Sequence, residues 1–347
     1  MRPLPLFWHY HPDEEFFDDA ISPSMTSLHT GEKLDHYLIE SLAARSGMAS
    51  IFRATDEITG KPVAIKIPHP EMEADPAFYE RFRREQEIGE KLDHPGVMKV
   101  FPKDHHSRLY MAMEWADGRL LRQVLNEEKK LPPERALKIA AQIASALEYI
   151  HGHGVVHRDL KPENIMVDAN DHIKLIDFGI AASIGSRRLT FAKFSSTMGT
   201  PDYISPEQVK GKRGDARSDI YSLGVMLYEM LTGKVPFTGP NAFTIMNDRL
   251  LNNPVPPREI DPTISPELQE IIYRAMERDP AKRYGSAREF AHDLAHPDQV
   301  GVAADRVELT NWRVRKQPMT RRIVLYVAMA LVPIIIFAIL LWVAKHT

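Results

Sequence analysis

Residues 157–164 read His157-Arg158-Asp159-Leu160-Lys161-Pro162-Glu163-Asn164, and thirteen residues later the chain reads Asp177-Phe178-Gly179. Phosphoryl transfer needs a base beside the accepting hydroxyl group, together with oxygen atoms that hold Mg²⁺ on the nucleotide. Asp159 suits the first role, and Asn164 and Asp177 suit the second. An isolated Asp-Phe-Gly is often an ordinary turn, but an eight-residue motif followed at loop–strand–loop spacing by a second motif indicates a catalytic site.

With these two motifs the chain resembles the eukaryotic-like Ser/Thr protein kinases, including their bacterial members. The form Asp-Leu-Lys-Pro-Glu-Asn at residues 159–164 and the run Gly199-Thr200-Pro201 resemble Ser/Thr kinases rather than tyrosine kinases. The resemblance covers residues 35–295 and implies an α+β fold with a small β-rich lobe and a large helical lobe. It also implies protein substrates and the cofactors ATP and Mg²⁺, with Mn²⁺ as an alternative metal.

The resemblance assigns a role in the reaction to three residues of the first motif. Asp159 would accept the proton of the substrate hydroxyl group or orient that group. Lys161 would neutralise charge on the transferred phosphoryl group. Asn164 would bind the metal together with Asp177.

The nucleotide phosphates are expected to meet Lys66, which lies in the run Val63-Ala64-Ile65-Lys66 that resembles the family's third strand. An ammonium group there can bridge the phosphates if a carboxylate holds it in place. Glu85, 19 residues further on, is the best candidate. Either residue alone would be read as a surface charge, but together, upstream of the catalytic motif, they predict an ion pair.

The adenine ring is expected to bind at residues 113–116. By resemblance, Met113 is the gatekeeper, and backbone groups around Glu114 and Ala116 would bind adenine. Ile51 and Ala64, in the preceding β-prone runs, would complete the nucleotide site.

The glycine-rich loop departs from the family pattern. The three motif glycines are replaced by Ala44, Ser46 and Ala49, and Gly47 stands at a variable position of the motif. Glycine lets backbone amides approach phosphates closely and makes unusual backbone angles accessible. The loop is still assigned to the nucleotide site, and we expect it to handle nucleotide more weakly or more slowly.

A second departure is Gly89, one helical turn after Glu85, where relatives place an apolar side chain against the Phe of Asp-Phe-Gly. Glycine within a helix costs about 1 kcal/mol relative to alanine. We therefore expect less packing for Phe178 and a mobile helix in which the Lys66–Glu85 pair forms only part of the time. The alternative is that neighbouring residues fill the space.

Three further residues are assigned by resemblance to support or regulation. Asp219 would brace the catalytic loop, and Arg283 would pair with Glu207 of Ser205-Pro206-Glu207. Arg158 would receive a phosphate from the segment between Asp177 and Glu207, where a phosphate can order a loop against arginine. The acceptors available for self-phosphorylation there are Thr190, Ser195, Ser196 and Thr197.

The composition is that of a globular protein: 44% of the 347 residues are hydrophobic and 26% are charged. A net charge of −3 gives no reason to expect nucleic-acid binding. The chain has no cysteine, which excludes disulfides, thiolate metal sites and cysteine nucleophiles.

Four regions are predicted along the chain. Residues 1–33 form a flexible arm, 34–295 the kinase domain, 296–322 a polar and basic linker, and 323–344 a transmembrane helix. Within the domain, β-prone runs at Tyr37–Ile39, Ser50–Phe52 and Val63–Ile67 precede a helix at 77–92 and a strand at Leu109–Trp115. Helices are predicted to begin at Pro132-Pro133 and at Ser265-Pro266.

The membrane prediction rests on 22 residues without a charge, Ile323 to Ala344. At about 1.5 Å per residue they span the ~30 Å hydrocarbon core of a bilayer. The basic residues lie mainly upstream, which orients the kinase domain toward the cytoplasm, as in a bacterial inner-membrane protein. They are Arg313, Arg315, Lys316, Arg321 and Arg322, and they are also candidates for binding anionic lipid.

Two alternatives remain open at this stage. The altered glycine loop fits a pseudokinase scaffold at the membrane with little turnover, although the retained Lys66, Asp159 and Asp177 favour catalysis. An adaptor role for the arm at 1–33 is compatible with either. The sequence leaves open whether the protein is a dimer.

Overall fold

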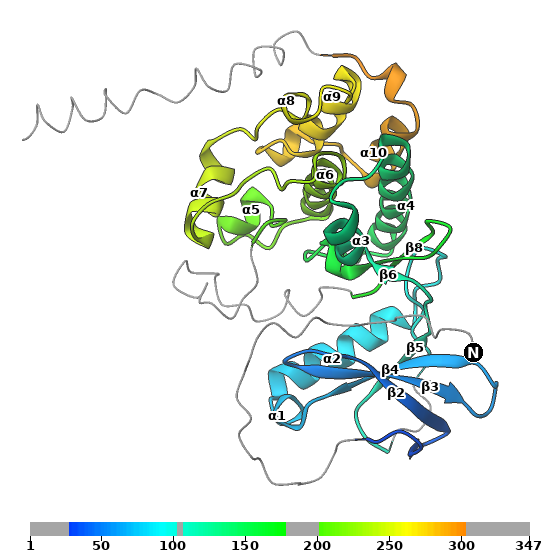
Figure 1. Ribbon diagram of the computed structural model, residues 1–347. Coiled ribbons are helices and arrows are strands. Elements are labelled where there is room, and N and C mark those ends of the chain that lie inside the picture. Colours follow the sequence, from blue (N-terminus) through cyan, green and yellow to red (C-terminus); the bar gives the residue numbers. More distant parts are fainter. Residues whose placement is uncertain (1–27, 103–106, 178–200, 303–347) are drawn as a thin grey trace, which may run out of the picture. The chain divides into compact units, whose positions relative to one another are not determined.

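The computed structural model describes residues 28–102, 107–177 and 201–302, which form a small lobe and a large lobe (Figure 1). The small lobe is built on an antiparallel sheet with its strands in sequence order. These strands are β1 (Lys33–Leu34), β2 (Tyr37–Arg45), β3 (Ala49–Asp56), β4 (Pro62–Pro68) and β5 (Met111–Glu114). The helices α1 (Pro70–Glu73) and α2 (Pro76–Gly89) accompany this sheet.

The large lobe is mainly helical and carries a short antiparallel sheet of β6 (Arg119–Leu120), β7 (Ile165–Val167) and β8 (Ile173–Leu175). Its helices are α3 (Leu121–Glu128), α4 (Pro133–Gly152), α5 (Pro206–Val209), α6 (Ala216–Thr232), α7 (Ala242–Leu251), α8 (Pro257–Ile260), α9 (Pro266–Ala275) and α10 (Ala287–Ala295). Short 3₁₀ turns lie at η1 (Pro162–Asn164), η4 (Pro280–Lys282) and η5 (Pro297–Gln299).

Strand β4 buries side chains on both faces of the small-lobe sheet, since successive side chains along a strand point to opposite faces. On β4, Val63, Ile65 and Ile67 join one apolar cluster with residues of β2 and β3. Ala64 faces the other way and packs with Met113 and with residues of α2. Lys66 shares the face of Ala64, so it points toward the side of the sheet that carries α2.

The core of the large lobe forms where α4 and α6 bury side chains almost completely. Ile139, Ile143, Leu147 and Ile150 recur at helical spacing on α4 and are fully buried. A proline at its first residue matches the predicted start of the helix at Pro132-Pro133. The helix α6 is buried along nearly its whole length, which makes it the central element of this lobe.

The predicted strands and helices are confirmed, with shifts at their ends. Asp75 caps α2, so the helix begins at Pro76, and it ends at Gly89 because residues 90–92 turn to bury Leu92. Strand β5 is shorter than the predicted 109–115, since only Met111–Glu114 pairs with β4. Ser265 caps α9, which begins at the predicted Pro266.

The packing gap predicted at Gly89 is wrong. A β-carbon placed on Gly89 would lie 2.4 Å from Cγ2 and 3.0 Å from Cβ of Val100. The alternative, that a neighbouring residue fills the space, therefore describes the structure: Val100 occupies it. Gly89 is also the last residue of α2, where glycine weakens a helix least. The argument for a mobile helix loses its structural basis, and Phe178 lies outside the described residues.

We accordingly expect Gly89→Ala to destabilise the chain by about 1–3 kcal/mol, the usual cost of overpacking a core. Rotation of the Val100 side chain would remove the contact with Cγ2 but would leave its Cβ at 3.0 Å, so Val100 would also have to shift. Urea unfolding measures the effect, with Gly152→Ala as the control, since a β-carbon there meets nothing within 4 Å. An unchanged unfolding midpoint for Gly89→Ala would show that Val100 yields easily.

Across residues 28–102, 107–177 and 201–302, no helix is both long and apolar enough to cross a bilayer. The predicted transmembrane helix at 323–344 and the predicted arm at 1–33 lie, wholly or almost wholly, outside these ranges.

Candidate active site

Lys66 joins the two lobes through its ammonium group. Its Nζ lies 3.2 Å from Oε1 of Glu85 on α2 and 2.9 Å from Oδ1 of Asp177 in the large lobe. Lys66 and Glu85 are largely buried, whereas the Asp177 side chain is 45% exposed. The predicted Lys66–Glu85 pair is thus present, and Asp177, 111 residues from Lys66, lies within hydrogen-bonding distance of the same ammonium group.

Electrostatics keep Lys66 charged. Burial lowers the pKa of Lys66, but the carboxylates of Asp177 and Glu85 outweigh burial and raise it above its usual range. Burial raises the pKa of Glu85, which the ammonium group of Lys66 opposes. The site therefore presents a fixed cation beside a partly exposed carboxylate, as a phosphate-binding and metal-binding centre requires.

The backbone of the catalytic motif is held by Asp219 of α6. Its buried carboxylate accepts hydrogen bonds from the N–H groups of His157 at 2.9 Å and Arg158 at 2.8 Å, and lies 2.8 Å from Nε2 of His151. Arg158 has a φ of +65°, a conformation that L-residues rarely adopt and that these bonds help to hold. The arrangement supports the bracing role proposed for Asp219.

Asp159 projects from this held backbone toward solvent, with its side chain 50% exposed. Nζ of Lys161 lies 2.8 Å from its Oδ2, and Nδ2 of Asn164 donates to its backbone carbonyl at 2.8 Å. A substrate hydroxyl group can therefore reach the carboxylate, with an ammonium group already beside it.

The donor set at Asn164 and Asp177 fits a Mg²⁺ ion. Because Nδ2 of Asn164 is bound to the Asp159 carbonyl, its Oδ1 remains for a metal, and Asp177 keeps its second carboxylate oxygen. Among the described residues no group of three or more His, Cys, Asp or Glu side chains could hold a metal. Phosphate and water oxygens would have to complete the coordination, which Mg²⁺ at nucleotide sites favours.

One apolar cluster contains four of the predicted adenine-binding residues: Ile51, Ala64, Met113 and Ala116. Ala64 and Met113 are buried there, and Ile51 is partly buried beside them. Met166 of β7 joins the same cluster from the large lobe. Sequence reasoning missed Met166, although its position two residues after Asn164 in a buried strand is a signal that could have located it.

The hinge residue Glu114 is fixed by contacts that the sequence did not predict. Its backbone N–H donates to the Lys99 carbonyl at 2.9 Å, and its Oε1 lies 2.6 Å from Nζ of Lys174 on β8. None of the described residues accepts a hydrogen bond from the N–H of Ala116. That N–H group is therefore the clearest donor for adenine at the hinge.

The altered glycine loop is a turn between β2 and β3. Ala44 lies in β2, Ala49 begins β3, and Ser46 and Gly47 lie in the turn. A β-carbon on Gly47 would meet nothing within 4 Å, so the turn is open at that position.

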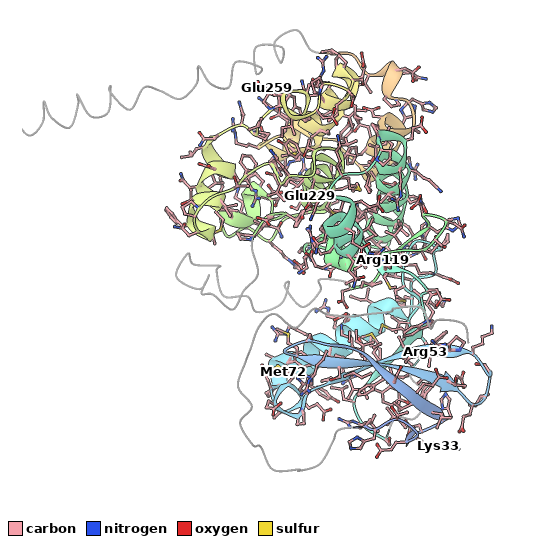
Figure 2. The ribbon with its side chains drawn as sticks, viewed as in Figure 1. Lys33, Arg53, Met72, Arg119, Glu229 and Glu259 are labelled. Carbon is pink, nitrogen blue, oxygen red and sulfur yellow. The ribbon has the colours of Figure 1, made fainter. Side chains whose placement is uncertain are left out.

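A network around Arg122 supports the catalytic loop and was also missed. Its Nε lies 2.8 Å from Oε1 of Glu163 and its Nη1 2.8 Å from Oε1 of Glu229 on α6, which is labelled in Figure 2. Tyr203 bonds to both Arg122 and Glu229. Glu163 belongs to the catalytic motif, so this network ties that motif to α3 and α6.

Arg283 and Glu207 form the predicted buried pair. Nη1 of Arg283 lies 2.8 Å from Oε1 of Glu207, and Nη2 lies 2.7 Å from Oε2. The phosphate acceptors Thr190, Ser195, Ser196 and Thr197 lie outside the described residues.

The chain matches the sequence model of a family described as a protein kinase domain over residues 45–295. A probable serine/threonine-protein kinase of Streptomyces coelicolor is 40% identical over 263 residues, which are 74% of this chain and 39% of that protein. Serine/threonine-protein kinase PknB of Mycobacterium tuberculosis is 36% identical over 265 residues, 75% of this chain and 42% of its own length.

A solved structure, the PknI kinase domain of Mycobacterium tuberculosis, superposes with a TM-score of 0.61 and 28% identity. The superposition covers 78% of this chain and 100% of the solved chain. The chain spans less than half the length of the curated relatives described above.

Proposed function

This chain belongs to the protein kinase family, and we propose that it transfers the γ-phosphoryl group of ATP to Ser and Thr hydroxyl groups of proteins. The observation that carries the proposal is the contact of Lys66 with both Glu85 and Asp177. Strand β4, helix α2 and the segment after β8 meet at this contact, beside the motif that contains Asp159 and Asn164. Phosphoryl transfer requires these groups together.

Each residue of the site has a separate role in the proposed reaction. Asp159 receives the proton of the substrate hydroxyl group, and Lys161 places a positive charge beside it. Lys66, held by Glu85, would bind the nucleotide phosphates, and Asn164 with Asp177 would hold the metal. When bound, ATP supplies the phosphoryl group and Mg²⁺ neutralises its charge. Self-phosphorylation at Thr190, Ser195, Ser196 or Thr197 remains part of the proposal.

The rival function is a pseudokinase scaffold with little turnover, and the altered loop at residues 44–49 is the observation that favours it. Transfer of ³²P from labelled ATP by the full-length chain in lipid vesicles, with a generic basic protein as substrate, separates the two. Incorporation into Ser and Thr is the expected result. No incorporation with either Mg²⁺ or Mn²⁺ would favour the scaffold.

We also propose that residues 323–344 anchor the protein in a membrane, with the kinase domain in the cytoplasm of a bacterium. Support comes from the uncharged 22-residue run and the basic residues that precede it. Binding of anionic lipid by those basic residues is a further part of this proposal. Fractionation of cells that express the chain with and without 323–344 tests the anchor. Equal amounts of both forms in the soluble fraction would rule it out.

A further inference from the structure

The turn that replaces the glycine-rich loop is closed by its own serine. Oγ of Ser46 accepts hydrogen bonds from the N–H of Met48 at 3.3 Å and the N–H of Ala49 at 3.1 Å. The same hydroxyl group donates to the Ala49 carbonyl at 3.0 Å. The Ser46 side chain therefore lies inside the turn and uses two of its backbone donors.

This turn stands next to the residues assigned to the phosphates. Strand β3 pairs with β4 so that Ile51 lies opposite Lys66, and the turn ends three residues before Ile51. The Met48 carbonyl accepts the N–H of His69 at 2.9 Å, which fixes the turn to the end of β4. Ala49 and Ile51 point to the same face of the sheet because they are two residues apart. That face is the one that carries Lys66 and Met113.

Backbone N–H groups in such a loop are the donors that cover nucleotide phosphates in protein kinases. Here the N–H groups of Met48 and Ala49 already face an oxygen atom of the protein. A phosphate oxygen can use them only after the Ser46 hydroxyl group has turned away. Ala44 and Ala49 also replace motif glycines, but their side chains carry no polar atom that could compete.

We propose that the Ser46 hydroxyl group competes with nucleotide phosphates for the backbone N–H groups of Met48 and Ala49, and thereby sets the affinity of this kinase for those phosphates. The inference rests on the proposed function, because it assigns a role within the same ATP site. It predicts that removing the hydroxyl group tightens the binding of phosphorylated nucleotides and leaves the binding of adenosine unchanged. A gain in affinity that is limited to phosphorylated nucleotides separates this role from a general effect on the site.

The test is a calorimetric titration of the full-length chain in detergent with Mg²⁺ and a non-hydrolysable ATP analogue, with ADP, and with adenosine. Ser46→Ala is expected to bind the analogue and ADP about twofold to tenfold more tightly, the range set by the net value of one hydrogen bond. Ser46→Gly should bind these nucleotides at least as tightly as Ser46→Ala does. Ser46→Thr, which keeps the hydroxyl group, should bind them with the affinity of the native chain. Adenosine should bind all four proteins equally.

Ser50→Ala is the matched control, since the Ser50 hydroxyl group lies in the adjoining strand and contacts His69 rather than a loop amide. Equal or weaker binding of the ATP analogue by Ser46→Ala would overturn the inference, and so would an equal gain for adenosine. The titration does not require turnover. Tighter binding by Ser46→Ala in a protein that transfers no phosphate would support the inference and refute the proposed transferase. If the protein transfers phosphate but Ser46→Ala leaves its affinity for the ATP analogue unchanged, the transferase proposal stands and the inference about Ser46 is refuted.

Discussion

Asp159→Asn is expected to slow phosphoryl transfer by about 100-fold to 10,000-fold, the usual contribution of a positioned general base. The substitution keeps the size of the side chain but removes the carboxylate that would receive the proton. The backbone at this position is held from elsewhere, by Asp219 and by Asn164, so the loop should keep its conformation. The initial rate of ³²P transfer to a protein substrate measures the loss.

Two further measurements make the Asp159 result decisive. Titration with an ATP analogue should give the same affinity for Asp159→Asn as for the native chain, because Lys66, Glu85 and Asp177 are unchanged. Asp298→Asn, an exposed aspartate in η5, should retain the native rate. If Asp159→Asn kept more than a tenth of the native rate, Asp159 would not be the base.

Arg283→Ala is expected to destabilise the large lobe by about 3–5 kcal/mol, the cost of breaking a buried ion pair from one side. The Arg283 side chain is 0% exposed and holds Glu207 with two bonds. It also donates to the carbonyls of Arg217 at 2.8 Å and Glu277 at 2.7 Å. Its loss leaves the Glu207 carboxylate buried with Ser218 as its remaining described side-chain partner.

Urea unfolding of single and double variants measures this pair. Combining Arg283→Ala with Glu207→Gln should cost much less than the sum of the two single changes, because the second removes the charge that the first leaves unpaired. Arg217→Ala, which breaks an exposed pair with Asp215, is the control and should cost about 1 kcal/mol or less. Additive effects of Arg283→Ala and Glu207→Gln would mean that the two residues do not act as a pair.

The same pair predicts a dependence on pH. Burial raises the pKa of Glu207, but the hydrogen bonds and charge of Arg283 outweigh burial and hold it below the ordinary value of 4.5. A carboxyl group whose pKa is lowered on folding stabilises the protein fully above its unfolded pKa. That contribution is lost as the pH falls from about 4.5 through the folded pKa. The difference in stability between the native chain and Arg283→Ala should therefore shrink in acid.

The sequence was sufficient to predict the two lobes and the pairing of Lys66 with Glu85. Local patterns predicted the strands at Tyr37 and Val63 and the helix starts at Pro133 and Pro266, because hydrophobic period and proline placement act over a few residues. Motif spacing predicted the meeting of Lys66 and Glu85. Asp177 also contacts Lys66, although 111 residues separate them.

Other features depend on contacts that no local pattern records. Val100 fills the space at Gly89 only because β5 and the chain before it pack against α2. The partners of Arg122 come from residues 41 and 107 positions away in the sequence. The hydroxyl group of Ser46 turns inward, which the replacement of a glycine by serine does not itself predict.

The hydrogen bonds from His157 and Arg158 to Asp219 affect how the catalytic loop responds to warming. Asp219 belongs to α6, which is buried along nearly its whole length, so a well-packed part of the large lobe holds the backbone that precedes Asp159. Asn164 of the η1 turn holds the Asp159 carbonyl in addition. The catalytic loop should therefore keep its geometry on warming for as long as α6 stays packed. Loss of that geometry and melting of the large lobe are then a single event.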